Sequence, residues 1–372
     1  MHLAHARGAG SLRLPQPPFE HLLRLSDGTG LFEHASSAGP LRNYGYCTDD
    51  VARGLVVVVR EPSPPPELRR LESLYFSFLV HAQLPDGRFH NRLSAAPECR
   101  WLDEVGSDDA IGRALWALGA AAAGGRSPGL RHRALARFEL GTDFCSPSPR
   151  ANAAAVLGAV QVLASRRDHR PARALLEKAA ARLGTVSADP TWPWPEARLA
   201  YDNARLAEGR IAAGVALGDQ RLLNEGLRLL DWLVATETCG DHLSFTPHRG
   251  WTLGEPRPGF DQQPIEAGAM ADACARAFDT TGEARWANAC LRAAEWFLGT
   301  NDAGLPLLDA ATGGCSDGLG PDGRNRNEGA ESTLALISAL QQARSIQAAA
   351  RRAASTSAAA TVAAPTWRSD AP

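Results

Sequence analysis

Two kinds of hydrophobic pattern alternate along this chain. In one kind, small and apolar residues follow one another for several turns with few charges, as in "DEVGSDDAIGRALWALGAAAA" (103–123). In the other, apolar residues recur at positions i, i+3, i+4 and i+7 with charges between them, as in "ELRRLESLYFSFLVHAQ" (67–83). The first pattern predicts a helix that is covered on all sides, and the second predicts a helix buried on one face only.

The covered type occurs six times, and each copy opens on a polar or acidic residue. The six openings are at Asp49, Asp108, Asn152, Asp202, Glu266 and Glu331. Amphipathic segments lie between them, at 67–83, 129–140, 170–184, 220–237 and 283–300, and a short one at 18–27 comes before the first copy. Because apolar helices must be surrounded, we predict an all-α (α/α)6 toroid, a six-hairpin barrel with the apolar helices inside. An open helical solenoid would show the same repeat, but the lack of polar end caps favours closure.

The connections differ in length in a regular way. Long segments rich in Gly and Pro come before the covered helices, whereas short ones such as "LGDQR" and "TTGEAR" join the other helix ends. The long segments, with short β-hairpin-like loops, should gather at one end of the ring, an arrangement typical of a site built by loops on a rigid scaffold. We expect the toroid to span 16–348, with disordered segments at 1–15 and 349–372 because of their composition.

Composition narrows the class of protein. Lys and Arg number 39 against 41 Asp and Glu, so no charge excess points to nucleic acid or to an anionic membrane. No apolar run approaches the ~20 residues of a membrane-spanning helix, and the start lacks the apolar core of a signal peptide. The seven cysteines show no CxxC or Cys/His metal spacing, which favours free thiols in a reducing compartment. We expect a soluble, cytoplasmic protein, and without phosphate-loop, dinucleotide, zinc-protease or nucleophile-elbow motifs we expect no cofactor and no metal.

Paired carboxylates open the first two covered helices. One aspartate at a helix start can cap backbone N–H groups, and we expect one of the "TDD" pair to do so while the other faces the cavity of the ring. Cleavage of a glycosidic bond needs a carboxylic acid for the leaving oxygen and a second carboxylate as base or nucleophile. The candidate catalytic residues are therefore Asp49, Asp50, Asp108 and Asp109. The preferred pair is Asp50 with Asp108 or Asp109, with Asp202, Glu266 and Glu331 in reserve.

Arginines follow these acids at a helical spacing. Arg53 and Arg113 come four residues after Asp49 and Asp109, a position suited to ion pairs along one helix face. We interpret both arginines as salt-bridge partners of those acids. Arg324 and Arg326, near the last covered helix, could instead hold an anion such as phosphate.

Aromatic residues gather in the long loops although they make up only 6 % of the chain. Flat apolar faces beside carboxylates suit a sugar ring, whose C–H face stacks while its hydroxyls form hydrogen bonds. The loop histidines His34, His90, His242 and His248 are interpreted as substrate contacts or surface rather than zinc ligands. The expected substrate-binding set is Tyr44, Phe89, His90, Trp101, Trp192, Asp202, Trp251, Asp261, Glu266, Glu328 and Glu331.

Three motifs carry a resemblance to a known family. "YCTDDVARGL", "GSDDAIGRALWALG" and "NEGAESTLALISAL" resemble the six-hairpin glycosidase-like proteins, which form (α/α)6 toroids. More narrowly, they look like a bacterial group often encoded beside or fused to sugar glycosyltransferases. The resemblance covers residues 18–345. The group's first motif more often reads TDDNARAL, so Val51 and Gly54 depart from it.

The resemblance implies action on sugars, and several reactions occur on this fold. We expect a glycoside hydrolase that acts on an oligosaccharide or glycoconjugate, with a possible functional association with a glycosyltransferase. A sugar phosphorylase is one alternative, and a sugar epimerase or isomerase is another. The epimerase needs a His or Tyr base on the inner helices, where this chain has no histidine. A non-catalytic glycan-binding module is the third, because a fold does not by itself fix a function.

Overall fold

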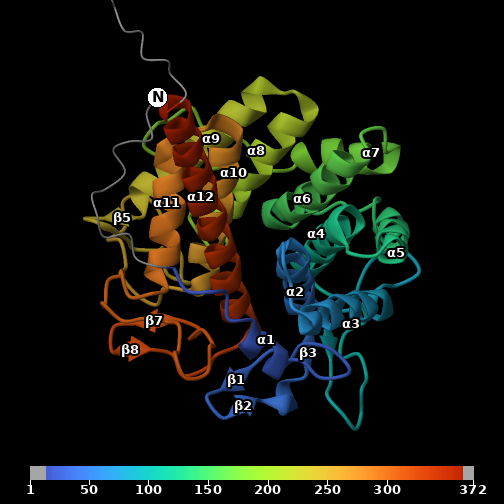
Figure 1. Ribbon diagram of the computed structural model, residues 1–372. Helices are drawn as coiled ribbons and strands as arrows, with labels where there is room; N and C mark the ends of the chain where they lie inside the picture. Colours follow the sequence, from blue (N-terminus) through green and yellow to red (C-terminus); the bar gives the residue numbers. More distant parts are fainter. Residues whose placement is uncertain (1–13, 363–372) are drawn as a thin grey trace, which may run out of the picture.

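Twelve α-helices dominate the part of the chain that the computed structural model describes, residues 14–362, of which 353–362 are described as backbone only. Six of them form an inner ring: α2 (Thr48–Arg60), α4 (Asp108–Gly124), α6 (Pro149–Ser165), α8 (Ala204–Leu217), α10 (Pro264–Thr281) and α12 (Ala330–Val362). Six others lie outside it: α1 (Phe19–Leu25), α3 (Pro66–Ala82), α5 (Pro128–Leu140), α7 (Arg170–Ala180), α9 (Gln220–Thr236) and α11 (Ala284–Trp296) (Figure 1).

The inner ring is closed. Each inner helix packs against the next inner helix along the chain, and α12 returns to α2. The Gln341 side chain on α12 donates a hydrogen bond to the Val57 carbonyl on α2 at 3.0 Å. Outside the ring, α12 packs against α11 and also against α1, which comes from the other end of the chain. The sixth hairpin is therefore shared between the two ends, and the predicted toroid is confirmed over an open solenoid.

Small residues on the inner helices allow their backbones to approach closely. A Cβ atom at Gly119 of α4 would lie only 2.3 Å from the carbonyl oxygen of Gly158 on α6. Both helices are buried over most of their length, as their apolar composition predicts. The outer helices instead bury one face; in α7 the buried residues are Ala172, Leu175, Leu176 and Ala179, spaced i, i+3, i+4 and i+7.

Short β-hairpins lie in the long connections. They are β1 (Ala35–Ser36) with β2 (Gly39–Pro40), β5 (Thr238–Cys239) with β6 (His242–Leu243), and β7 (Leu319–Gly320) with β8 (Gly323–Arg324), all antiparallel. A fourth antiparallel pair, β3 (Tyr46–Cys47) with β4 (Arg92–Leu93), joins the connections that lead into α2 and α4. Every long connection leads into the N-terminus of an inner helix, so these N-termini share one end of the ring. In Figure 1 the hairpins β1–β2 and β7–β8 lie at the bottom of the view, at this end.

The domain boundaries stay a prediction. Residues 1–13 and 363–372 lie outside the described residues, so the expected state of these segments is not addressed by the structure. At the C-terminal side, α12 continues as a helix to Val362, beyond the boundary expected at 348. No helix among the described residues is long and apolar enough to cross a membrane.

Candidate active site

A cavity of about 570 Å³ opens at the N-terminal ends of the inner helices, and we call it the entrance cavity. Its wall combines four carboxylates with two guanidinium groups, three hydroxyls and one amide. The lining residues are Asp49, Arg53, Ser107, Asp108, Asp109, Arg113, Ser148, Tyr201, Gln263, Ile265 and Glu331. They come from the inner helices or from the residues just before them, and all six inner helices contribute.

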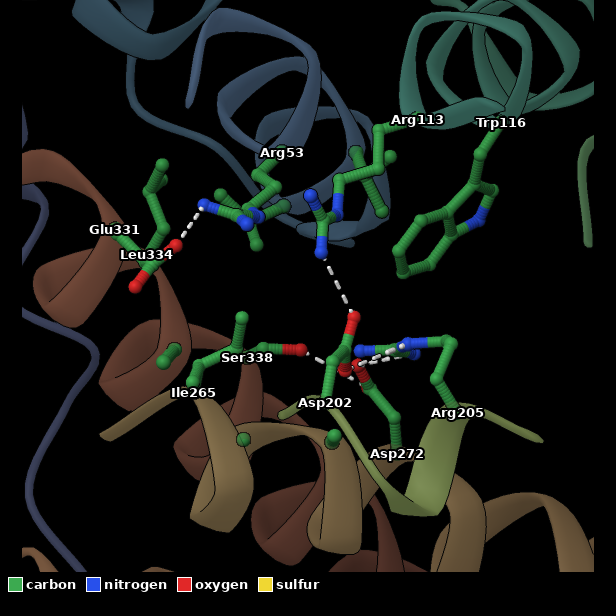
Figure 2. Close-up of a pocket in the computed structure, with 15 residues that line it drawn as sticks. Arg53, Arg113, Trp116, Asp202, Arg205, Ile265, Asp272, Glu331, Leu334 and Ser338 are labelled. Atoms are coloured by element: carbon green, nitrogen blue, oxygen red, sulfur yellow. Dashed lines mark hydrogen bonds and ion pairs between the residues drawn. The ribbon is translucent and has the colours of Figure 1, made fainter. Parts of the chain in front are cut away.

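A smaller space of about 40 Å³ lies farther inside the ring, and we call it the deep cavity. It shares Arg53, Arg113, Ile265 and Glu331 with the entrance cavity, so the two are neighbouring levels of one central space. Figure 2 shows how its side chains converge from several helices. The labelled members that belong to the deep cavity alone are Trp116, Asp202, Arg205, Asp272, Leu334 and Ser338.

The start of α2 places its two aspartates differently. Asp49 lines the entrance cavity, whereas the Asp50 side chain is only 6 % exposed and lines neither cavity. Burial raises the pKa of Asp50 well above its usual value, although Arg53 acts in the opposite direction. Asp50 was half of the preferred catalytic pair, and the structure instead brings Asp49 to the cavity.

Neither aspartate caps α2. Its N-cap residue is Cys47, which makes no side-chain capping bond. The first N–H groups are satisfied by Asn91, whose backbone carbonyl accepts from Thr48 N at 2.8 Å and whose side-chain oxygen accepts from Asp49 N at 3.3 Å. The expectation of an aspartate cap is therefore wrong, because the loop before α4 supplies the cap from outside. At α4 the cap is Ser107, which accepts from Ala110 N at 3.3 Å.

Two arginines bind most of the acids near the centre of the ring. Arg53 contacts Asp49 at 3.3 Å, Asp50 at 3.0 Å and Glu331 at 2.7 Å. Arg113 contacts Asp49 at 2.8 Å. The predicted i,i+4 pair of Arg53 with Asp49 is confirmed. The predicted partner of Arg113 is wrong, because Arg113 reaches across the ring to Asp202, at 3.0 Å, rather than along its own helix to Asp109.

Asp109 is held in a different way. One of its oxygens accepts a hydrogen bond from the Tyr201 hydroxyl, and the other accepts from the Ser148 hydroxyl at 3.0 Å. Its neighbour Asp108 accepts from the Ser146 hydroxyl at 2.6 Å. These hydroxyls come from the connections before α6 and α8, so two segments outside α4 fix its two carboxylates.

The deep cavity is closed by an ion network. Arg205 contacts Asp202 at 3.4 Å and Asp272 at 3.3 Å, and it also binds Glu208. Arg60 contacts the other oxygen of Asp272 at 2.9 Å. Burial acts against ionisation of Asp272, but the two arginines prevail and lower its pKa to about 2.

Glu266 supports the site from behind. It lines neither cavity, and its carboxylate accepts from Asn203 N at 3.1 Å, from the Asn203 side chain at 3.0 Å and from Asp202 N. Asp202 has a φ of +48°, a conformation that few non-glycine residues adopt and that these bonds hold in place. Burial, together with the charges of Glu237 and Asp202, raises the pKa of Glu266 to about 8.

The remaining predicted acids lie elsewhere. Glu328 is buried and accepts from the Thr312 hydroxyl at 2.7 Å, outside both cavities. Asp261 lines a separate surface cavity of about 530 Å³ together with His248, Asp317 and Arg324. That cavity shares Gln263 with the entrance cavity. Arg324, a predicted anion contact, binds Asp309 at 3.1 Å.

The predicted aromatic residues pack mainly against protein, and none lines the entrance or the deep cavity. Trp192 contacts Trp232 and Trp251 with ring centroids 5.3 and 5.5 Å apart. Trp101 stacks on His90 at 4.9 Å. Phe89, also in the predicted set, is fully buried, whereas Tyr44 is half-exposed.

Some lining residues were absent from the predicted set. Tyr201, Ser148 and Gln263 line the entrance cavity, and no pattern marked them except that Tyr201 directly precedes Asp202 in "YDN". Of the predicted set, the entrance cavity brings together Asp49, Asp108, Asp109 and Glu331, and the deep cavity contains Asp202.

Comparison with known proteins gives likeness of structure only. No family model matches the chain, and no curated protein matches its sequence. A cellobiose 2-epimerase from Bacillus thermoamylovorans B4167 aligns with a TM-score of 0.69 and 8 % identity, over 88 % of this chain and 96 % of that one. The cellobiose 2-epimerase from Spirochaeta thermophila DSM 6192 aligns with a TM-score of 0.67 and 13 % identity, over 88 % and 93 %.

An endoglucanase also aligns over most of this chain. CelQ from Clostridium thermocellum, solved with cellotriose, has a TM-score of 0.62 and 12 % identity, over 88 % of this chain and 69 % of that one. These structures share the six-hairpin (α/α)6 toroid with this chain. At such low identity the likeness establishes the fold.

Proposed function

We propose that this protein is a carbohydrate-active enzyme and that it hydrolyses a glycosidic bond in the entrance cavity. The observation that carries the proposal is the convergence of four carboxylates from three inner helices around one cavity of about 570 Å³. That volume falls within the ~300–1,000 Å³ typical of small-ligand sites. Support of a weaker kind comes from the fold, because the structurally similar proteins named above include two epimerases and an endoglucanase, named for sugar substrates.

The two reacting carboxylates must stand on opposite sides of the bond that breaks. Asp108 and Asp109 are neighbours on one helix, so they cannot do this together. Glu331 on α12 is separated from Asp109 on α4 by α2, and both line the cavity. We therefore assign Asp109 and Glu331 as the catalytic pair, in place of the pair preferred from sequence.

The contacts of each acid suggest its role. Asp109 accepts hydroxyl hydrogen bonds on both oxygens, so it is oriented as an acceptor and is the base or nucleophile. Glu331 has one ion-pair partner, Arg53, which contacts Oε2, and its side chain is 42 % exposed. The acid that gives a proton to the leaving oxygen is then Glu331 by elimination, and in this role it has to bind that proton against the influence of Arg53. Asp49 is bound by two arginines, and its role is to hold those arginines in place.

The cavity also limits the substrate. Four carboxylates face only two guanidinium groups, and both arginines already bind acids. This excess of negative charge opposes binding of uronic acids or sugar phosphates and favours a neutral sugar or an amino sugar. The same charge argues against phosphorolysis at this site, since phosphate would have to enter a cavity of like sign.

A sugar epimerase is the second candidate, and a specific contact favours it. Tyr201, in the connection just before α8, lines the cavity with its hydroxyl bonded to Asp109, so a tyrosine stands beside a carboxylate as an acid–base group. In that reaction the proton would move between the sugar carbon and this pair, and no glycosidic bond would break. The mass of the sugar would then stay unchanged.

The test is product analysis on a panel of neutral oligosaccharides and amino-sugar oligosaccharides, with and without phosphate. Wild type would be compared with Asp109→Asn, Glu331→Gln and the surface control Asp231→Asn. Hydrolysis predicts smaller sugars that both cavity variants fail to release and the control still releases. If the product were instead an isomer of unchanged mass, the proposed hydrolysis would be wrong and the reaction would be an epimerisation. If the wild type bound sugar but formed no product, and both cavity variants bound sugar equally well, the protein would be a glycan-binding module and not an enzyme.

A further inference from the structure

We infer that the β5–β6 hairpin and the segment after α11 form a binding site for one zinc-type divalent cation, with Cys239, His242 and Asp302 as ligands. One ligand atom from each residue lies within 4.8 Å of the other two. Thiolate, imidazole and carboxylate are the three ligand types that Zn²⁺ takes in proteins. The site is separate from both cavities of the ring and does not depend on the proposed function.

The hairpin itself brings two of the ligands together. Cys239 and His242 are paired residues on opposite strands, joined by the two-residue turn Gly240–Asp241. Directly opposed residues in an antiparallel pair project to the same face, with Cβ atoms roughly 5 Å apart. Gly240 has a φ of +58°, which the tight turn needs and which glycine adopts without strain. "CGDH" (239–242) is thus a Cys-x-x-His spacing, which corrects the expectation that the cysteines show no Cys/His metal spacing.

The third ligand comes from a distant part of the chain. Asp302 follows α11, and its Oδ1 lies 3.2 Å from His242 Nε2. In a tetrahedral zinc site with bonds of 2.0–2.2 Å, nitrogen and oxygen ligands are separated by about 3.3 Å. Such a site would leave its fourth position for water, because three protein ligands are present.

Other groups hold the ligands in the required orientation. The second ring nitrogen of His242, Nδ1, faces Asp241 Oδ1 at 3.4 Å, the carboxylate–histidine arrangement that fixes which nitrogen binds a metal. The second oxygen of Asp302 accepts from the side chain of Gln262, which is fully buried. Gln262 precedes Gln263 of the entrance cavity, so an ion here would stiffen the loop beside that cavity.

A second group with metal-ligating side chains provides a contrast. Glu33, Cys47 and Asp50 also have ligand atoms within 4.8 Å of one another. Their carboxylates already bind cations of the protein, since Arg92 contacts Glu33 at 2.7 Å and Arg53 contacts Asp50 at 3.0 Å. At the hairpin site no arginine or lysine pairs with Asp302 among the ion pairs of the described residues. A metal ion is therefore favoured at the hairpin site and not at the buried one.

The first experiment measures zinc binding by the full chain. Protein stripped with EDTA and dialysed would be titrated with Zn²⁺ against a chromophoric chelator, for wild type, Cys239→Ser, His242→Gln and the control Cys145→Ser, another exposed cysteine. We expect one Zn²⁺ per chain for wild type and control, and binding at least tenfold weaker in the two ligand variants. With Co²⁺, a thiolate charge-transfer band should appear in wild type and be absent in Cys239→Ser. Absence of micromolar zinc binding by wild type, or equal affinity in Cys239→Ser, would overturn the proposal.

A second measurement needs only the wild-type protein, in case a variant fails to fold. Cys239, Cys99 and Cys145 are the exposed cysteines among the described residues. Zn²⁺ should slow alkylation of Cys239 by iodoacetamide at least tenfold, as followed by peptide mass spectrometry, while the rates at Cys99 and Cys145 stay unchanged. Equal protection of all three thiols would show non-specific zinc uptake and contradict the assigned site.

Discussion

The two levels of the central space use the same residue types to different ends. In the deep cavity, Asp272 is bound by Arg60 and Arg205 and also accepts from the Ser338 hydroxyl at 2.9 Å. In the entrance cavity, Asp109 binds only hydroxyl groups, and Glu331 has a single arginine partner and remains 42 % exposed. A buried carboxylate bound by two arginines stabilises the ring, whereas one with spare acceptors beside an open cavity is available for chemistry.

The largest expected effect is on activity at the entrance cavity. Asp109→Asn and Glu331→Gln should each lower the hydrolysis rate by roughly 10²–10⁴-fold, because a positioned acid or base contributes about that much. The free energy of unfolding, measured in urea, should change by less than about 1 kcal/mol in Glu331→Gln, since its ion pair is part-exposed. If Asp109→Asn or Glu331→Gln kept its activity but lost stability, the entrance cavity would have a structural role and the contrast with the deep cavity would be wrong.

The deep cavity should respond in the opposite way. Asp272→Asn leaves Arg60 and Arg205 without their shared carboxylate inside the ring, and we expect a loss of about 3 kcal/mol in the free energy of unfolding. The control Asp231→Asn, which breaks an ion pair between half-exposed side chains, should cost less than about 1 kcal/mol. Equal effects of the two variants in urea denaturation would show that the network adds no stability.

Acid should weaken the deep network selectively. The pKa of Asp272 is lowered from 3.8 to about 2, so the folded state binds this proton less readily than the unfolded state does. The stability that Asp272 contributes is therefore complete above pH 4 and is lost as the pH falls through 3.8 towards about 2, by roughly 2 kcal/mol. The difference in unfolding free energy between wild type and Asp272→Asn should shrink over this range. A difference that stayed constant between pH 5 and pH 3 would contradict the lowered pKa.

The smallest effect is expected from Tyr201→Phe, which removes one hydroxyl donor to Asp109. Loss of a hydrogen bond to a charged group costs about 1.5 kcal/mol, so hydrolysis should fall by roughly tenfold. Ser148→Ala is the matched variant on the other oxygen of Asp109. If the protein is an epimerase with Tyr201 as acid–base group, Tyr201→Phe should instead abolish isomer formation while Ser148→Ala lowers it only a few-fold. Comparison of the two rates separates the two functions.

The sequence was sufficient for the fold. Each predicted helix opening, from Asp49 to Glu331, lies within a few residues of the start of an inner helix, because burial on all sides leaves a clear pattern of small and apolar residues. The closed ring could be predicted because each of the six apolar helices has to be surrounded by other helices. Long connections at one end of the ring followed from the loop lengths alone.

The site was less accessible to sequence reasoning. Whether Asp49 or Asp50 faces the cavity depends on a rotation of about 100° per residue, and the position of that first turn is set by Asn91 from another loop. The loop residues Trp192 and Trp251 were predicted to stack on sugar, but they contact each other, and Trp192 also contacts Trp232 of α9. Nothing in the spacing reveals this packing. Cross-ring contacts such as Arg113 with Asp202 join residues 89 positions apart, beyond the reach of helical periodicity.

The pairing of α1 with α12 has a consequence for synthesis of the protein. A nascent chain carries its five complete hairpins out of the ribosome before the last inner helix is made, and until then the apolar sides of α2 and α10 have no α12 between them. The ring can be sealed only by contacts of very high sequence separation, such as that between His21 and the Glu328 carbonyl, 307 positions apart at 3.1 Å. Sealing is therefore a late step of folding, which has to wait until α12 has been made.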